Sequence, residues 1–401
     1  MTEATALPAL PRGRFNYPTP YRIGAGIVTD LPAACRELCF SRVLVVTDAG
    51  VEKLPWFASL SKSLADEGLL GGVFSAVSTN PTGADIEAGL TAFRDAKADG
   101  ILLLGGGSPM DVGKCVALLA HNPGTVFDYE DVGDNFKRAD PDKVVKMIAI
   151  PTTAGTGSEV GRCGVIADAR DHAKKIIFHP RLLPALVIAD PDLTLGLPER
   201  LTAATGMDAL AHAFEAYCAP GYHPMADGIA LEAMRLVDKW LPIAVRDGSD
   251  RVARTHMLMA ASMGATAFQK GLGLVHALSH PLGGVTGIHH GTANAIFLPY
   301  VLEFNRPVVT EKMDHLARVL DLPKKGAVGV MDWLLRLRSD LGMPHALEGQ
   351  NGADASIARK IAEMGMLDPS LGSNPREATV DDLERVMRAA LAGDVNAAGR
   401  A

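Results

Sequence analysis

The sequence predicts an α/β domain followed by an all-α domain. Through the first half of the 401 residues, short runs of leucine, isoleucine and valine alternate with amphipathic stretches, a pattern typical of a parallel sheet covered by helices on both faces. After about Pro198, segments rich in alanine, leucine and methionine replace these runs. Because single cores rarely grow beyond about 250–300 residues, the length also indicates two domains. We expect an α/β domain over residues 1–197 and a helical domain over residues 198–401.

The expected elements follow one another along the chain. The predicted strands are 42–48 (RVLVVTD), 71–77 (GGVFSAV), 100–104 (GILLL), 147–153 (MIAIPTT) and 185–191 (ALVIADP). Amphipathic patterns predict helices around 62–68, up to about Ala98, and from about Pro109. The segments 201–218 and 255–269 predict helices of the second domain, and Thr379 with Asp382 forms the capping-box pattern of a helix start.

Composition excludes several classes of partner. A formal net charge of −7 provides no basic stripe for nucleic acid, and no apolar run approaches the roughly 20 residues of a membrane span. The first twenty residues lack a basic segment followed by an apolar run, so we expect no secretory signal. Five cysteines, an odd number without a CxxC pair, favour reduced thiols. We expect a cytoplasmic protein that binds neither nucleic acid nor membrane.

A glycine-rich turn follows the strand predicted at 100–104. Gly105, Gly106, Gly107 and Ser108 stand where ligands gather in open parallel sheets, outside the carboxyl end of a strand. Successive glycines let backbone approach a pyrophosphate, and a helix from about Pro109 would direct its positive end at that anion. The turn is therefore a candidate phosphate cradle, although GGGS also suits a plain strand-to-helix connection.

Two further strand ends indicate the same ligand. Thr152, Thr153 and Thr156 offer hydroxyls after the strand at 147–153. Asp48 follows the first predicted strand, where a carboxylate can accept hydrogen bonds from ribose hydroxyls and would repel a 2′-phosphate. These positions predict a Rossmann-like dinucleotide-binding domain that prefers NAD to NADP. The alternative for Asp48 is a helix cap alone.

Acidic and imidazole side chains predict a metal site in the second domain. Asp208 and His212 are four residues apart, as are His276 and His280, so each pair shares a helix face. Four of the twelve histidines fall between His276 and His290. One carboxylate with imidazoles from separate helices suits iron(II), zinc or cobalt(II). The alternative is that each histidine is merely a polar group on a helix surface.

With these motifs in place, the sequence resembles the iron-containing, group III alcohol dehydrogenase family along nearly its whole length. The resemblance is carried by GGGSPMDVGK (105–114), PTTAGTGSEV (151–160), ADPDL (189–193), GMDALAHAFEAY (206–217), GLVHALSHPLGG (273–284), HHGTANA (289–295) and NPR (374–376). It implies a dehydroquinate synthase-like fold, in which a Rossmann-like dinucleotide-binding domain precedes a helical metal-binding domain. The catalytic metal of the family lies between the two domains.

The resemblance also implies roles for individual residues. The metal ligands would be Asp208, His212, His276 and His290. His280 would be the catalytic residue that positions the substrate or relays a proton beside the nicotinamide, whereas His289 would have no chemical role. The cofactor-binding positions would be Asp48, Asn80, Gly106, Gly107, Ser108, Asp111, Thr152, Thr153, Thr156 and Lys174, with Lys175 as the alternative to Lys174. Cys163 stands where some members carry asparagine, and the substrate pocket has no transferable pattern.

The expected function is hydride transfer between NAD(H) and a small alcohol or aldehyde, assisted by Fe²⁺ or by Zn²⁺. One alternative is a hydroxyacid–oxoacid transhydrogenase that keeps its cofactor tightly bound. Another is polyol oxidation of the glycerol dehydrogenase kind, and dehydroquinate synthases share the same two-domain plan. A non-catalytic metal or nucleotide sensor is the alternative from another class. The resemblance implies a homodimer or a larger homo-oligomer.

Overall fold

The first half of the chain forms a six-stranded parallel sheet. The computed structural model of the protein describes residues 19–170 and 173–400, and the strand order is β1-β8-β5-β4-β2-β3. Every neighbouring pair is parallel. The strands are β1 (Tyr21–Ile23), β2 (Val43–Val46), β3 (Leu70–Phe74), β4 (Gly100–Gly105), β5 (Met147–Pro151) and β8 (Leu186–Ala189).

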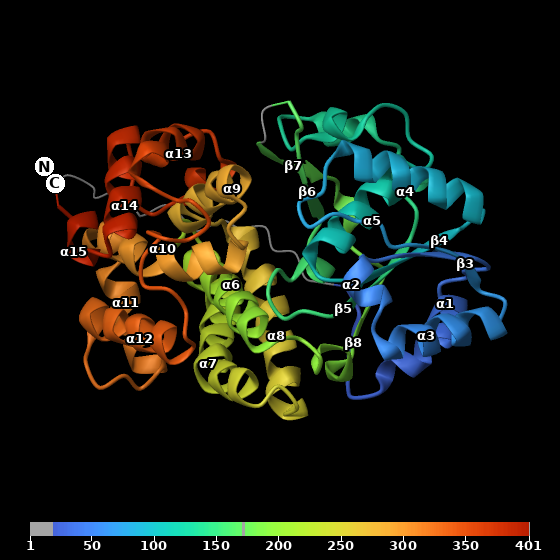
Figure 1. Ribbon diagram of the computed structural model, residues 1–401, viewed down its shortest axis with the longest axis horizontal. Coiled ribbons are helices and arrows are strands. Elements are labelled where there is room, and N and C mark those ends of the chain that lie inside the picture. Colours follow the sequence, from blue (N-terminus) through green and yellow to red (C-terminus); the bar gives the residue numbers. More distant parts are fainter. Residues whose placement is uncertain (1–18, 171–172, 401) are drawn as a thin grey trace, which may run out of the picture.

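Helices cover both faces of this sheet (Figure 1). Successive side chains of a strand point to opposite faces, so Val43 and Val45 join one core cluster, whereas Leu44 and Val46 join another. The first cluster packs against α1 and α3, the second against α4 and α5. The helices of this half are α1 (Leu31–Glu37), α2 (Ala49–Glu52), α3 (Pro55–Asp66), α4 (Gly83–Ala96) and α5 (Gly107–Leu119).

A separate antiparallel hairpin leaves the sheet after β5. Its strands β6 (Cys163–Ala167) and β7 (Lys174–Phe178) pair from Cys163 with Phe178 to Ala167 with Lys174. Neither this hairpin nor the short strand β1 was predicted, because β1 has only three residues and β7 begins with two lysines, and the short apolar run of β6 (CGVIA) was not singled out. All five predicted strands are present, with ends that differ by a few residues.

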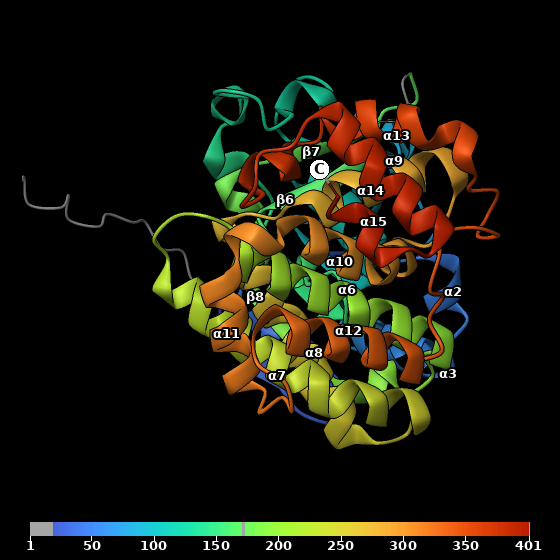
Figure 2. The same cartoon turned by 90° about the vertical axis from the view of Figure 1, so that its left-hand side faces the viewer.

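The second half of the chain is helical and packs around its own core (Figures 1 and 2). Within the described residues after Ala189, no strand occurs, as the change of composition predicted. The capping box of Thr379 and Asp382 is also present. The helices are α6 (Glu199–Cys218), α7 (Pro224–Arg246), α8 (Arg251–Ala267), α9 (Leu274–Thr286), α10 (His290–Asn305), α11 (Thr310–Val319), α12 (Gly326–Asp340), α13 (Ala358–Gly365), α14 (Val380–Ala392) and α15 (Val395–Ala398).

None of the helices in the described part of the chain combines the length and apolar character that a membrane span requires.

Candidate active site

The glycine turn joins β4 to α5 and leaves no room for side chains. Gly105 has a φ of +147°, and Gly106 precedes the first residue of α5, Gly107. A β-carbon on Gly106 would lie 3.2 Å from Thr153 Oγ1, and one on Gly107 would lie 2.9 Å from Thr156 Oγ1. The structure thus brings the predicted glycine turn and threonine loop into contact at the carboxyl ends of β4 and β5.

Thr152 links the same two loops through the backbone. Its N–H donates to the carbonyl of Gly105 at 3.0 Å, and its side chain is buried. The α5 N-terminus and this loop together form a surface rich in backbone N–H groups and hydroxyls, which suits a phosphate.

Asp48 is a helix cap and also faces the glycine turn. Its Oδ1 accepts hydrogen bonds from the N–H groups of Gly50 (2.8 Å) and Val51 (3.0 Å) at the start of α2. A β-carbon on Gly105 would lie 3.6 Å from the other oxygen, Oδ2. The two readings of Asp48 are therefore compatible, because capping uses one oxygen and leaves the second beside the turn.

Ser108, Asn80 and Asp111 lie around the start of α5. The Ser108 hydroxyl donates to the carbonyl of Thr79 at 3.0 Å, which places the exposed Asn80 beside the turn. Asp111 is buried, and its two oxygens accept from Ser158 Oγ (2.7 Å) and from the N–H of Val165 (3.1 Å). Burial raises the pKa of Asp111, against the opposing effect of Lys114.

The predicted metal ligands converge on one oxygen. Asp208 Oδ1 lies 3.7 Å from Nε2 of His212, 3.8 Å from Nε2 of His276 and 3.5 Å from Nε2 of His290. Within the described residues, Asp208, His276 and His290 form a group whose ligand atoms all lie within 4.8 Å of one another. His212 joins this group through Asp208 and through its ring, which stacks on that of His276 at 4.7 Å.

Two further residues hold this cluster, and sequence reasoning missed both. Glu215 Oε2 accepts from Nδ1 of His276 at 2.5 Å, and Oε1 accepts from the N–H of Val275. Asn294 Nδ2 donates to Asp208 Oδ1 at 2.8 Å and lies 3.1 Å from Nε2 of His290. Both could have been found by helical spacing, since Glu215 follows Asp208 by seven residues and Asn294 follows His290 by four.

Burial and charge set the protonation of the cluster. Burial lowers the pKa of His212 to about 4 and that of His290 well below its usual value, although Asp208 opposes both shifts. Burial alone would raise the pKa of Asp208, but the imidazoles outweigh it and the pKa is lowered. For His276, burial is outweighed by Glu215 and Asp208, which raise its pKa to about 9. The cluster thus presents a carboxylate and two neutral imidazoles, the donor forms that a metal requires.

The donor set fits a divalent first-row cation. Four ligands about 2.1 Å from one tetrahedral cation lie about 3.4 Å apart, close to the 3.5–3.8 Å that separate Asp208 Oδ1 from the three Nε2 atoms. The amide nitrogen of Asn294 lies 2.8 Å from Asp208 Oδ1, 3.3 Å from His276 Nε2 and 3.1 Å from His290 Nε2. Carboxylate and imidazole ligands are compatible with iron(II) and with zinc.

His280 and Lys174 line a cavity of 460 Å³ next to this cluster. His280 Nδ1 donates to Asp368 Oδ2 at 2.8 Å, and its ring stacks on that of His290 at 5.3 Å. Lys174 begins β7, and burial lowers its pKa although Asp111, Asp208 and Asp368 favour its charge. The cavity therefore connects the hairpin of the first half with α9 of the second.

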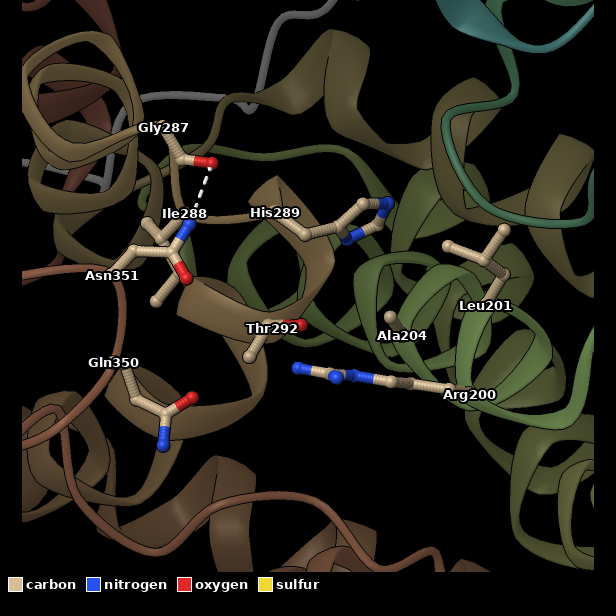
Figure 3. A pocket seen from close by; sticks show the side chains of 9 residues that line it. All are labelled: Arg200, Leu201, Ala204, Gly287, Ile288, His289, Thr292, Gln350 and Asn351. Carbon is tan, nitrogen blue, oxygen red and sulfur yellow. Dashed lines mark hydrogen bonds between the residues drawn. The ribbon is translucent and has the colours of Figure 1, made fainter.

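His289 points into a different pocket (Figure 3). This pocket has a volume of 250 Å³ and lies between α6 and the start of α10, where Asn351 Nδ2 donates to the carbonyl of Gly287 at 3.1 Å. Arg200 extends into it from α6. His289 and His290 therefore lie at different sites, because only His290 belongs to the cluster around Asp208.

Comparison with known proteins agrees with this geometry. Residues 18–191 match the family model of iron-containing alcohol dehydrogenases, and residues 202–391 match the C-terminal model of the same family. The 4-hydroxybutyrate dehydrogenase of Cupriavidus necator is 40% identical over 389 residues, which cover 94% of this chain and 99% of that protein.

Solved structures match the fold as well. A 1,3-propanediol oxidoreductase superposes with a TM-score of 0.88 at 33% identity, covering 94% of this chain and all of the other. The sulfoacetaldehyde reductase of Bifidobacterium kashiwanohense, in complex with NAD⁺, superposes with a TM-score of 0.85 at 29% identity, covering 94% and 98%. The family implies NAD(H) and a metal as cofactors. The chain therefore belongs to the iron-containing alcohol dehydrogenase family and is an NAD(H)-linked oxidoreductase that acts on the CH–OH group of alcohols.

Proposed function

We propose that Asp208, His212, His276 and His290 bind one divalent cation and that the glycine turn and threonine loop bind the pyrophosphate of NAD(H). One observation carries the proposal. Gly155, in the threonine loop, abuts Thr205 on α6, where an added β-carbon would lie 2.7 Å from Thr205 Cβ. Asp208 follows Thr205 by one turn of the same helix, so the dinucleotide loop and the metal cluster are held in contact.

When bound, the cation supplies Lewis acidity that lowers the pKa of an alcohol oxygen or polarises an aldehyde carbonyl. The side chains of the protein hold the reacting groups in position. Asp368 orients the ring of His280 toward the cluster, where His280 holds or passes the proton that the alcohol loses. Lys174 places a cationic group beside Asp208 at the same cavity. Asp208 and His276 are almost completely buried, which limits the access of bulk water to the cluster.

We propose that the preferred cofactor is NAD, because the second oxygen of Asp48 faces the glycine turn and would repel a 2′-phosphate. Asn80, Gly106, Gly107, Ser108, Asp111, Thr152, Thr153, Thr156 and Lys174 complete the proposed cofactor site. Iron(II) is the proposed native metal, with zinc as the alternative that the donor set also accepts.

We propose a short primary alcohol with a second polar group as the substrate. Relatives named as 4-hydroxybutyrate dehydrogenase and 1,3-propanediol oxidoreductase act on alcohols of this kind, and sulfoacetaldehyde is a short anionic aldehyde. A hydroxyacid–oxoacid transhydrogenase with a tightly held cofactor is the second candidate, and it would not release NADH.

We also propose the domain division 1–197 and 198–401, which the gap between the two matched family models supports. The five cysteines are free in the structure, which supports a cytoplasmic location. A homodimer or larger assembly is proposed from the family resemblance, and light scattering would test it.

The function is tested by anaerobic purification, metal analysis and a screen of short alcohols, diols, hydroxy acids and aldehydes with free NAD(H). The proposal predicts a bound first-row metal and many turnovers of free NADH with an aldehyde. Turnover confined to one bound cofactor would favour the transhydrogenase. Absence of turnover with every compound in the metal-loaded protein would contradict both.

A further inference from the structure

We propose that Arg162 binds the carboxylate of a short ω-hydroxy acid while its hydroxyl end lies at the metal cluster. This inference rests on the proposed function, and it assigns the substrate class to a named side chain. It follows from the shape of one cavity, the direction of the β6–β7 hairpin and the charges around it.

The cavity has a volume of 670 Å³ and lies between the two halves of the chain. Its walls come from the β6–β7 hairpin, from residues 265–272 at the end of α8 and beyond, and from residues 369–373. Phe268 lines the cavity, and its ring contacts that of His212 edge-on with centroids 5.1 Å apart. Phe268 therefore contacts both the cavity and the metal cluster.

The hairpin extends from the cluster toward the far end of this cavity. Lys174, Ile176 and Phe178 alternate along β7 and therefore share one face, with Lys174 nearest Asp208 and Phe178 at the other end. Phe178 pairs with Cys163, so Arg162 lies at the end of the hairpin remote from Lys174. This face of the hairpin therefore has one cation near the cluster, Lys174, and a second cation, Arg162, toward its other end.

The guanidinium of Arg162 stacks on an aromatic ring. Arg162 makes no ion pair with any carboxylate among the described residues, and its guanidinium lies over the ring of Phe178 at 5.5 Å. That ring is itself held edge-on by Phe136 at 5.8 Å. A guanidinium that is stacked on an aromatic ring keeps its planar N–H groups free for a carboxylate.

Neighbouring cations are already engaged. Lys175 pairs with Glu130 at 3.3 Å, and Arg181 pairs with Asp142 at 3.5 Å. Lys174 faces three carboxylates at the cluster end. Arg162 is therefore the cation best placed to receive an anionic substrate at the far end of the 670 Å³ cavity.

Asp131 carries a charge opposite to that of Arg162 and therefore provides a second test of the inference. It lines the same cavity beside Ile176, to whose carbonyl its own N–H donates at 2.8 Å. A carboxylate there repels an anionic substrate, whereas Arg162 attracts it. Replacing each residue by one with a neutral amide side chain must therefore change the preference for an anionic substrate in opposite directions.

The experiment compares two substrates of equal chain length, 4-hydroxybutyrate and butane-1,4-diol, with the metal-loaded enzyme and saturating NAD. We expect Arg162→Gln to lower the ratio of kcat/KM for the acid to that for the diol by about ten- to a hundredfold, mainly through KM. Arg162→Lys should retain part of the ratio, and Asp131→Asn should raise it. Lys360→Gln, which removes a cation from the adjacent cavity, is the matched control and should leave the ratio unchanged.

The experiment distinguishes failure of this inference from failure of the proposed function. If the wild-type enzyme oxidises the diol and not the hydroxy acid, or if Arg162→Gln lowers both values of kcat/KM equally, Arg162 is not the carboxylate site and the dehydrogenase assignment stands. A fall in the ratio with Lys360→Gln instead would place the carboxylate in the other cavity and overturn the inference. Absence of NAD-linked turnover with both compounds and with simple alcohols would overturn the proposed function itself.

Discussion

Glu215 accepts a hydrogen bond of 2.5 Å from Nδ1 of His276, whose other ring nitrogen, Nε2, lies 3.8 Å from Asp208 Oδ1. Glu215 and His276 are almost completely buried, with exposed fractions of 4% and 1%. Metal-binding imidazoles commonly donate their second N–H to a carboxylate, which fixes the tautomer and raises the basicity of the ligand atom. Glu215 is therefore a positioning residue that acts through His276.

Substitution of Glu215 by Gln should weaken metal binding by about 10- to 100-fold, because the amide replaces the anionic partner of His276 with a neutral one. Competition with a chromogenic chelator would measure the dissociation constant for Zn²⁺. Glu232→Gln, which removes a surface carboxylate paired with Arg235 on α7, is the control. Wild-type metal affinity in Glu215→Gln would show that the hydrogen bond does not support the site.

A methyl group at Gly107 should impair cofactor binding without removing the metal. The added β-carbon would lie 2.9 Å from Thr156 Oγ1 and would push the threonine loop away from the start of α5. We expect KM for NAD to rise about tenfold in Gly107→Ala, which corresponds to roughly 1.4 kcal/mol. Gly196→Ala, where nothing lies within 4 Å of the new carbon, should retain the wild-type KM. An unchanged KM in Gly107→Ala would place the pyrophosphate elsewhere.

Neutralising Asp48 should weaken the preference for NAD. Asparagine also caps helices, so Asp48→Asn keeps the start of α2 and removes only the charge. We expect the ratio of kcat/KM for NADP to that for NAD to increase by about tenfold. Asp250→Asn makes the same change at the cap of α8 and should not alter the ratio. If both variants behave like the wild type, Asp48 is a helix cap only.

Loss of His280 should slow turnover while the metal stays bound. Its ring stacks on that of His290 and is oriented by Asp368, outside the group of atoms that converge on Asp208 Oδ1. We expect His280→Ala to lower kcat by about 10²-fold, and Asp368→Asn to have a smaller effect of the same sign. His289→Ala, in the separate pocket, is the control. Loss of metal from His280→Ala would instead make His280 a ligand.

The fold was predictable where the relevant pattern is local. Strands β2, β4, β5 and β8 are buried along their whole length and consist of apolar runs that are visible in the sequence. Strand β1 has three residues, and β7 begins with Lys174 and Lys175, so neither resembles a buried strand. Such elements are defined by their partners in space, which the sequence does not display.

The residues of the candidate site were also predictable only where their pattern is local. Helical spacing placed Asp208 beside His212, and the same reasoning reaches Glu215 and Asn294, although neither was singled out. The contact between His280 and Asp368 spans 88 residues and leaves no local signal. The sequence also could not reveal that the loop containing Gly155 abuts Thr205, the contact that joins the two sites.

The central claim is that one cation is held by Asp208, His212, His276 and His290. The most direct test is the metal content of His276→Ala and of the wild type after anaerobic purification, measured by mass spectrometry together with NAD-linked turnover. The account predicts a stoichiometric metal in the wild type, and loss of both metal and turnover in His276→Ala while NADH binding, followed by fluorescence, persists. Wild-type turnover in a metal-depleted His276→Ala enzyme would contradict it.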